Sequence, residues 1–267
     1  MYFVAMLMIN IYNEKEIEVM QGGGRILAKI IKELIKKVKP GITTKYLDRV
    51  AEDLILKYGV KSSFKGFNNY PRVLCTSLNE EIVHAVPSDR ILKNGDILSL
   101  DLGIRHKGYC TDLAITVPVL DPTDRSGRTR VGKIDEKTKK LIAVTKKSLG
   151  IAIKQCKPGN HLEDIGWAIQ NYVERNGFNV IRDLVGHGVG KNVHEDPQIS
   201  NYGQKGQGEE LKQGMVLALE PMVSVGNWEI EKCEDGFGYR TKDHSLTAHF
   251  EHTIAITKKG PQILTKT

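Results

Sequence analysis

Two aspartates eleven positions apart stand in an apolar stretch of the chain. Asp101 and Asp112 lie in the run LSLDLGIRHKGYCTDLAIT, and Gly103 and Gly108 allow the chain to turn between them. A hairpin that turns near residues 105–107 would place both carboxylates on one face of a sheet. Buried carboxylates repel each other and are costly to desolvate, and a divalent metal ion would remove both objections. On these two residues alone, a metal site and two separately paired or turn-capping aspartates are equally good interpretations.

Two histidines lie in a second segment, GHGVGKNVHEDP, at residues 186–197. His187 and His194 are seven positions apart, and three glycines around them let the backbone approach a ligand closely. A lone histidine is more often an ordinary core or surface residue, but imidazole is a common metal ligand and proton-transfer group. The segment lacks the GxxxxGK[ST] spacing of a phosphate loop. Two histidines in this setting favour a ligand or catalytic role.

Two glutamates complete the candidate set. Glu220 lies in MVLALEPMV and Glu251 in LTAHFEHTIAI, two runs that read as strands in which an unpaired carboxylate is expensive. A buried salt bridge is the alternative for each. Five such residues, two Asp, one His and two Glu, in apolar or glycine-rich settings are hard to explain separately, and mixed oxygen and nitrogen ligands fit Mn, Fe, Co or Zn. A carboxylate-rich set also suits two ions about 3.5–4 Å apart, because bridging carboxylates hold both.

The elements that must position these residues follow one order twice, helices and then strands. Apolar residues at helical spacing predict helices over 14–39, 135–156 and 162–176, and a further helix that Thr43 or Thr44 caps and that runs to about Lys57. Strands are expected within 73–119, 214–225 and 247–257. The triple glycine at 22–24 would either permit close packing of the first helix or kink it. This order predicts an α+β fold with two similar halves around a central antiparallel sheet.

Composition places the chain among ordinary globular proteins. It has 267 residues, 40% hydrophobic and 27% charged, which suits a single catalytic domain over residues 8–267. Residues 1–7 are predicted to be a tail or the product of an upstream start codon, with Met8 as the natural first residue. The apolar N-terminus is too short to cross a membrane. Four scattered cysteines favour a reducing compartment, hence the cytoplasm. The formal charge of +7 is a mild excess and is interpreted as general surface character, so no specific DNA binding is predicted.

The candidate residues and their surroundings resemble the methionine aminopeptidases, which have the pita-bread fold. The matching runs are NEEIVHAVPSDRILKNGDILSLDLG, GYCTDLAIT, GHGVGKNVHEDP, LALEPM and TKDHSLTAHFEHT, and they span nearly the whole chain from about Met8. The intervals between His194, Glu220 and Glu251 leave no room for the helical insertion of the second subclass. The resemblance is therefore to the bacterial-like type I form, and it implies a monomer.

The resemblance implies a role for each residue. Asp112 and Glu251 would bridge two divalent ions, Asp101 would complete one metal site, and His187 and Glu220 would complete the other. Glu220 would also carry the proton to the departing amine. Two further histidines, His84 and His194, would hydrogen-bond the scissile amide and its developing oxyanion.

The implied reaction is removal of the initiator methionine from nascent proteins whose second residue is small. An activated water held by the metals would attack the first peptide bond. The methionine side chain would enter a small apolar pocket lined by Phe67, Tyr70, Cys75 and Phe237, together with Phe64.

Two other functions use the same fold. A prolidase or Xaa-Pro aminopeptidase shares the metal chemistry but usually carries a large N-terminal domain, and only 83 residues precede His84 here. A non-catalytic binding protein on this scaffold would tend to lose ligands, and all are present. In addition to catalysis, ribosome docking would be favoured by basic side chains at Arg125, Arg128, Arg130, Lys133, Lys232, Arg240 and Lys242.

Overall fold

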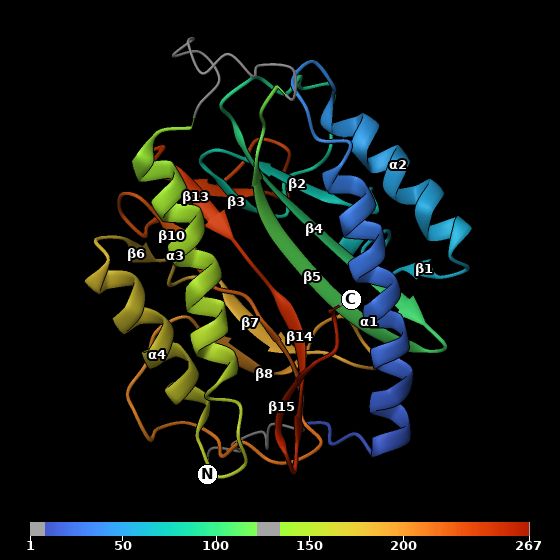
Figure 1. Cartoon of the computed structure of the whole chain (residues 1–267), viewed down its shortest axis with the longest axis vertical. Coiled ribbons are helices and arrows are strands. Elements are labelled where there is room, and N and C mark those ends of the chain that lie inside the picture. The colour runs from blue at the N-terminus through green and yellow to red at the C-terminus, as the bar shows by residue number, and fades with distance from the viewer. Residues whose placement is uncertain (1–8, 122–133, 267) are drawn as a thin grey trace, which may run out of the picture.

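The computed structural model describes residues 9–121 and 134–266 (Figure 1). The predictions for the tail at 1–7 and for Met8 fall outside these residues. Four of the basic residues proposed to contact the ribosome also lie outside them, namely Arg125, Arg128, Arg130 and Lys133. Within the described ranges, no helix is long and apolar enough to cross a membrane.

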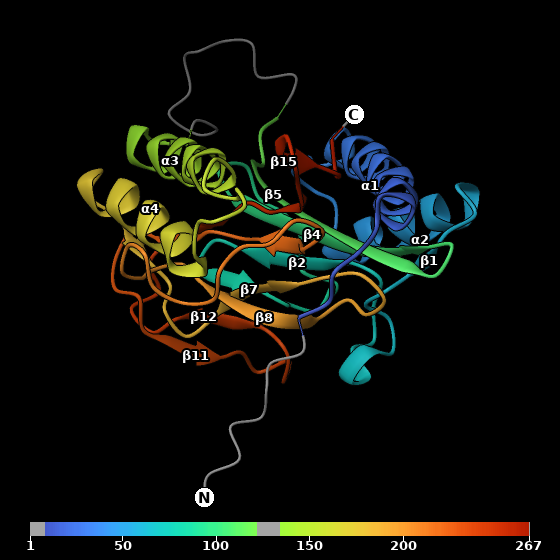
Figure 2. The same ribbon diagram turned by 90° about the horizontal axis from the view of Figure 1, so that it is seen from below.

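Within residues 9–121 and 134–266, four α-helices lie on one side of the sheets (Figure 2). The bounds of each helix agree with the predicted range within a few residues. Asn13 and Glu16 form a capping box at the start of the first helix, and Thr43 caps the second. The first helix ends four residues earlier than predicted, because the chain turns before Pro40. The helices are α1 Glu14–Ile35, α2 Thr44–Lys57, α3 Glu136–Ile153 and α4 Leu162–Arg175, and the 3-10 helix η1 is Phe67–Asn69.

The triple glycine lets α1 pack closely rather than kink. A Cβ atom at Gly24 would overlap the backbone carbonyl of Leu264, and one at Gly23 would lie 2.9 Å from the Cβ of His106. Side chains at these two positions would push the helix away from the strands beneath it. The first of the two alternatives for residues 22–24 is therefore correct.

Among the residues that the structure describes, all strand pairings are antiparallel, but they form four hydrogen-bonded sheets and not one. In one sheet β4 pairs with β5 along one edge and with β2 and β1 along the other, and the five-stranded sheet has the order β15-β14-β9-β7-β8. The three-stranded sheets are β13-β10-β6 and β11-β12-β3. The strands are β1 Lys61–Ser62, β2 Cys75–Leu78, β3 Glu81–Val83, β4 Ile97–His106, β5 Tyr109–Pro118, β6 Asn179–Val180, β7 Val185–Gly188, β8 Glu195–Ser200, β9 Val216–Leu219, β10 Met222–Ser224, β11 Ile230–Lys232, β12 Tyr239–Thr241, β13 Thr247–His249, β14 His252–Thr257 and β15 Gly260–Ile263.

Each pair of helices covers its own apolar core, as two similar halves require. Leu27, Leu47 and Leu100 belong to the core under α1 and α2. Leu141 and Ile165 belong to the second core, under α3 and α4. The α+β class and the two-halved architecture are confirmed, and the candidate residues lie where the halves meet.

The two halves are joined by hydrogen bonds between β5 and the start of β14. The Asp112 N–H donates to Thr253 Oγ1 at 2.8 Å, and this hydroxyl donates to the Asp112 carbonyl at 2.9 Å. The Glu251 N–H donates to the Ala114 carbonyl at 2.9 Å. These bonds hold Asp112 and Glu251 close together although 139 positions separate them in the sequence.

Candidate metal centre

The β4-β5 hairpin places the two aspartates on the same face of its sheet, as predicted. In the register, Gly103 lies opposite Asp112 and Asp101 lies opposite Ala114, so the two carboxylates are diagonal neighbours. The turn is formed by Lys107 and Gly108, with φ values of 48° and 93°. Such positive φ angles at both central residues match the tight turn that suits a twisted hairpin.

One ring nitrogen of His187 is used in a hydrogen bond to the backbone, and the other is available to bind a metal. Its Nδ1 lies 2.9 Å from the Gly188 carbonyl, which can only accept, so Nδ1 carries the proton. Nε2 is then the unprotonated nitrogen, and it lies 3.5 Å from Glu220 Oε1. A backbone carbonyl that fixes the tautomer in this way is typical of metal-binding histidines.

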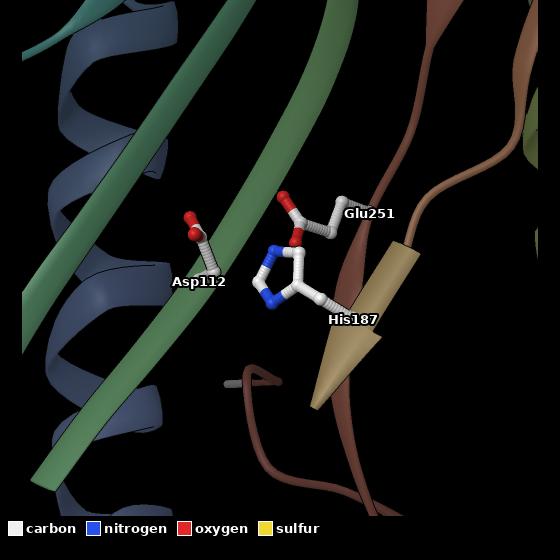
Figure 3. Close-up of side chains that lie close together, drawn as sticks. All are labelled: Asp112, His187 and Glu251. Carbon is white, nitrogen blue, oxygen red and sulfur yellow. The ribbon is translucent and has the colours of Figure 1, made fainter. Parts of the chain in front are cut away.

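Three buried side chains from different segments of the chain converge (Figure 3). Asp112, His187 and Glu251 each offer a ligand atom, and these atoms lie within 4.8 Å of one another. Asp112 comes from β5, His187 from β7 and Glu251 from the residue before β14. Such a set of oxygen and nitrogen donors could hold a divalent transition metal.

One cavity of about 110 Å³ gathers every residue predicted for the site. The five predicted metal ligands line it together with the two additional histidines. Aromatic residues, a cysteine and Asn68 form the rest of its wall, with Tyr70 and Phe237 packed edge to face at 5.5 Å. The lining comprises Phe64, Phe67, Asn68, Tyr70, Cys75, His84, Asp101, Asp112, His187, His194, Glu220, Phe237 and Glu251.

A wider cleft of about 610 Å³ adjoins this cavity. His84, His187, His194 and Glu220 line both spaces, so they mark the passage between them. The rest of the cleft is lined mostly by polar residues, among them Asp183 and, from β8, Glu195, Asp196 and Gln198. The site therefore consists of a small inner cavity and a larger outer space.

Burial forces the ionisable groups of the cavity towards their neutral forms. Desolvation raises the pKa of Asp112 to about 7 and that of Glu220 to about 8. It also raises the pKa of Asp101 and of Glu251 well above the ordinary range, with the Asp112 charge adding to both. The pKa of His187 is lowered to about 3, first by desolvation and then by His194. Four carboxylates this close need protons or cations to neutralise them.

A cation fits the unsatisfied atoms of this cluster. Asp101 Oδ1 and Glu251 Oε1 are buried, and among residues 9–121 and 134–266 neither has a hydrogen-bond partner. A buried carboxylate oxygen without a partner is costly, and a divalent ion would satisfy both atoms. The residues present therefore suit a metal centre, and the donors are those that Mn, Fe, Co or Zn accept.

The metal-free protein is expected to lose stability as pH rises from about 6.5 to about 8.5. Across this interval the folded protein still holds protons on carboxyls whose pKa values reach about 7 for Asp112 and about 8 for Glu220, while unfolded carboxyls are already ionised. Because the folded state binds more protons than the unfolded state in this interval, the free energy of unfolding falls with each rise in pH until those protons have left. Below about pH 6.5 the buried histidines, with lowered pKa values, oppose this trend.

The melting temperature of metal-stripped protein, measured by calorimetry across the same interval, checks this expectation. Added Mn²⁺ should remove most of the decline, because it takes over the neutralising role of the protons. A melting temperature that stays level or rises with pH in the stripped protein would contradict the proposed charge cluster.

Two predictions about local structure were wrong in detail. Glu220 and Glu251 do not lie within strands: Glu220 follows β9 and precedes Pro221, and Glu251 lies between β13 and β14. Successive side chains of a strand point to opposite faces of the sheet. Because each glutamate lies outside a strand, its side chain does not have to follow this order and can face the cavity. Pro221, which cannot donate to a strand ladder, was the local signal of the first interruption.

His249 was missed by the sequence reasoning. It is 1% exposed, and its Nε2 lies 3.4 Å from Glu220 Oε2, opposite the oxygen that faces His187. Its position depends on β5, because Thr116 Oγ1 accepts from the His249 N–H and donates to its carbonyl. The only sequence signal was a histidine two positions before Glu251 on an apolar strand, which is weak evidence by itself.

Comparison with known proteins agrees with this geometry. Residues 18–258 match the profile of "Metallopeptidase family M24". The chain is 45% identical over 258 residues to "Methionine aminopeptidase" of Clostridium perfringens, covering 97% of this chain and 99% of that protein. These similarities include the segments that carry the cavity residues.

Solved structures show the same fold. The crystal structure of a methionine aminopeptidase from Thermotoga maritima superposes with a TM-score of 0.91 at 45% identity, covering 97% of this chain and all of that one. A prolidase from Pyrococcus horikoshii reaches a TM-score of 0.73 at 24% identity, and the match spans 63% of the prolidase. At that identity the likeness shows the fold alone. The pita-bread architecture is confirmed.

Proposed function

Because this chain belongs to metallopeptidase family M24 and, within it, to the methionine aminopeptidases, we propose that it releases the N-terminal methionine of peptide chains through two divalent metal ions in the buried cavity. The observation that carries the proposal is the convergence of four carboxylates and one imidazole on a single small cavity. Asp112 and Glu251 would hold both ions, Asp101 would complete one site, and His187 with Glu220 would complete the other. The bound ions would supply a nucleophile at neutral pH by lowering the pKa of a water.

Glu220 is the residue that carries the proton. A carboxylate beside the attacking water can take a proton and return it within one reaction. The two oxygens of Glu220 lie 3.5 Å from His187 Nε2 and 3.4 Å from His249 Nε2, so the side chain stands between two imidazoles. From this position it serves the leaving amine at the mouth of the cavity.

His84 and His194 orient the scissile peptide bond. Both line the passage between the inner cavity and the cleft, where the first peptide bond of a bound chain would lie. Desolvation lowers the pKa of both rings, to about 4 for His84, so near neutral pH each donates a hydrogen bond as a neutral imidazole. Such positioned donors stabilise a developing oxyanion by a few kcal/mol.

The inner wall recognises the methionine side chain. Phe67, Tyr70 and Phe237 offer aromatic edges to a thioether, a contact worth roughly 0.3–1.5 kcal/mol. Cys75 adds a small, uncharged wall, because burial raises the pKa of its thiol well above the ordinary value. The remainder of the substrate peptide would lie in the cleft, and a small second residue would fit best in the passage between the cavity and the cleft.

Peptide hydrolysis tests the reaction and separates it from the prolidase alternative. With Mn²⁺ present, the protein should release methionine from Met-Ala-Ser and leave Ala-Pro-Ala intact. Cleavage of Ala-Pro-Ala alone would favour an Xaa-Pro peptidase. Lack of turnover of either peptide with any divalent ion would favour the non-catalytic scaffold.

The substrates are the N-termini of nascent proteins in the cytoplasm. All four cysteines are free thiols, as expected in a reducing compartment. Lys232 and Lys242 are exposed and available for contact with ribosomal RNA, whereas Arg240 is held by Glu231 at 2.7 Å and is a weaker candidate. Co-sedimentation with ribosomes should weaken as salt rises, and binding that is independent of salt would contradict an electrostatic contact.

A further inference from the structure

The segment at residues 10–12 lies against the loop that carries His194. The Tyr12 N–H donates to the Gly214 carbonyl at 2.8 Å, which anchors the segment beside β9. The Tyr12 side chain is only 5% exposed, and its ring fills the space beside Gly190 at the start of the loop. A Cβ atom at Gly190 would overlap this ring, so the glycine is needed for the contact.

Hydrogen bonds of Tyr12 and Glu195 fasten both ends of the loop. The Tyr12 hydroxyl donates to Glu195 Oε2 at 2.7 Å and accepts from the Lys191 N–H at 3.0 Å. Asn10 Nδ2 donates to the same Glu195 oxygen at 2.9 Å. The Asn192 N–H donates to Glu195 Oε1 at 2.8 Å, so both oxygens of this carboxylate are used. The loop from Lys191 to Glu195 is thereby tied to residues 10–12.

His194 depends on this loop for its position. Among the described residues, no side chain or backbone group holds the His194 ring by a hydrogen bond. The ring is in contact with His187 at a centroid distance of 4.3 Å and with Phe67 at 5.0 Å. Ring contacts restrain orientation weakly, and therefore the backbone on either side of His194 must fix where its nitrogens point.

We infer that Tyr12 and Glu195 are positioning residues that hold the His194 loop in the geometry needed for peptide hydrolysis. This inference rests on the proposed role of His194. Tyr12 acts from outside the cavity, through the loop backbone and Glu195, and neither residue belongs to the predicted metal or substrate set. Burial raises the pKa of Tyr12, so its hydroxyl remains a donor throughout the working pH range.

Removing the Tyr12 hydroxyl tests the inference. Tyr12→Phe keeps the buried ring and deletes only the two hydrogen bonds, so the protein should fold and keep its metal content. We expect kcat for Met-Ala-Ser to fall about 10-fold, the usual scale for the loss of an outer-shell contact, with KM little changed.

Tyr109→Phe is the matched control. Tyr109 packs edge to face with Tyr12 at 6.0 Å and donates its hydroxyl to Glu16 at 2.8 Å, away from the His194 loop. The control deletes a similar bond to a carboxylate in the same region, and its kcat should stay within about twofold of the parent value. An equal fall in both variants would overturn the inference.

A double variant shows whether Tyr12 acts through His194. In a His194→Ala background, Tyr12→Phe should cause no further fall in kcat, because the group it positions is already absent. A further 10-fold fall in that background would overturn the inference. Full activity of His194→Ala alone would also overturn it, by removing the role on which it rests. Failure of the proposed function itself is distinguishable, because the parent protein would then release no methionine.

Discussion

Asp112→Asn is expected to abolish methionine release and, at the same time, to stabilise the metal-free protein. The substitution removes one negative charge from the most crowded part of the cavity, where Asp101, Glu220 and Glu251 interact with it electrostatically. Without the bridging ligand that we propose, the second ion should be lost, and activity should fall more than about 10³-fold.

The gain in stability has a physical reason. An asparagine oxygen can still accept from the Leu113 N–H, which donates to Asp112 Oδ1 at 3.0 Å, so no local bond need be lost. The neutral amide carries less desolvation cost and no repulsion, which should raise the free energy of unfolding of metal-free protein at about pH 8 by on the order of 2 kcal/mol.

Metal analysis, peptide kinetics and urea unfolding measure these effects. Asp89→Asn is the control, because Asp89 is exposed and, in the described part of the chain, pairs only with Lys45; it should change neither activity nor stability. An Asp112→Asn variant with a tenth or more of the parent activity would contradict a bridging role. A less stable metal-free variant would contradict the repulsion argument.

Glu220→Gln is the second change expected to have a large effect. Glutamine keeps the size of the side chain but cannot carry a proton between the nucleophile and the leaving amine, so kcat should fall about 10²–10⁴-fold. The metal content of the purified variant then separates two contributions. A variant that keeps both ions and loses kcat would assign the effect to proton transfer, and one that loses an ion would assign it to metal binding.

The exposed Glu229 provides the control for the same substitution. Glu229→Gln should leave kcat and metal content unchanged. A Glu220→Gln variant that retains parental kcat with both ions bound would contradict the proposed role of Glu220 in proton transfer.

The sequence predicted those parts of the fold that depend on neighbouring residues. Helix caps such as Thr43 and the glycine turn between Asp101 and Asp112 are local signals, and both were confirmed. Division of the strands into four sheets was not foreseen, because several strands have only two or three residues and their pairing depends on distant segments.

The same limit separates the predicted from the missed parts of the site. The predicted site residues that belong to recognisable sequence motifs all line one cavity. His249 and Tyr12 were not found, because their partners Thr116 and Glu195 lie 133 and 183 positions away. Nothing near either residue in the sequence predicts contacts of that range.

The most direct test of the central claim is a titration of metal-stripped protein with Mn²⁺ or Co²⁺, following bound metal and methionine release from Met-Ala-Ser together. We predict no activity in the stripped protein, a rise with bound metal and a plateau at two ions per chain, with Asp112→Asn inactive throughout. Full methionine release by the stripped protein, or a plateau at one ion per chain, would contradict the two-metal site.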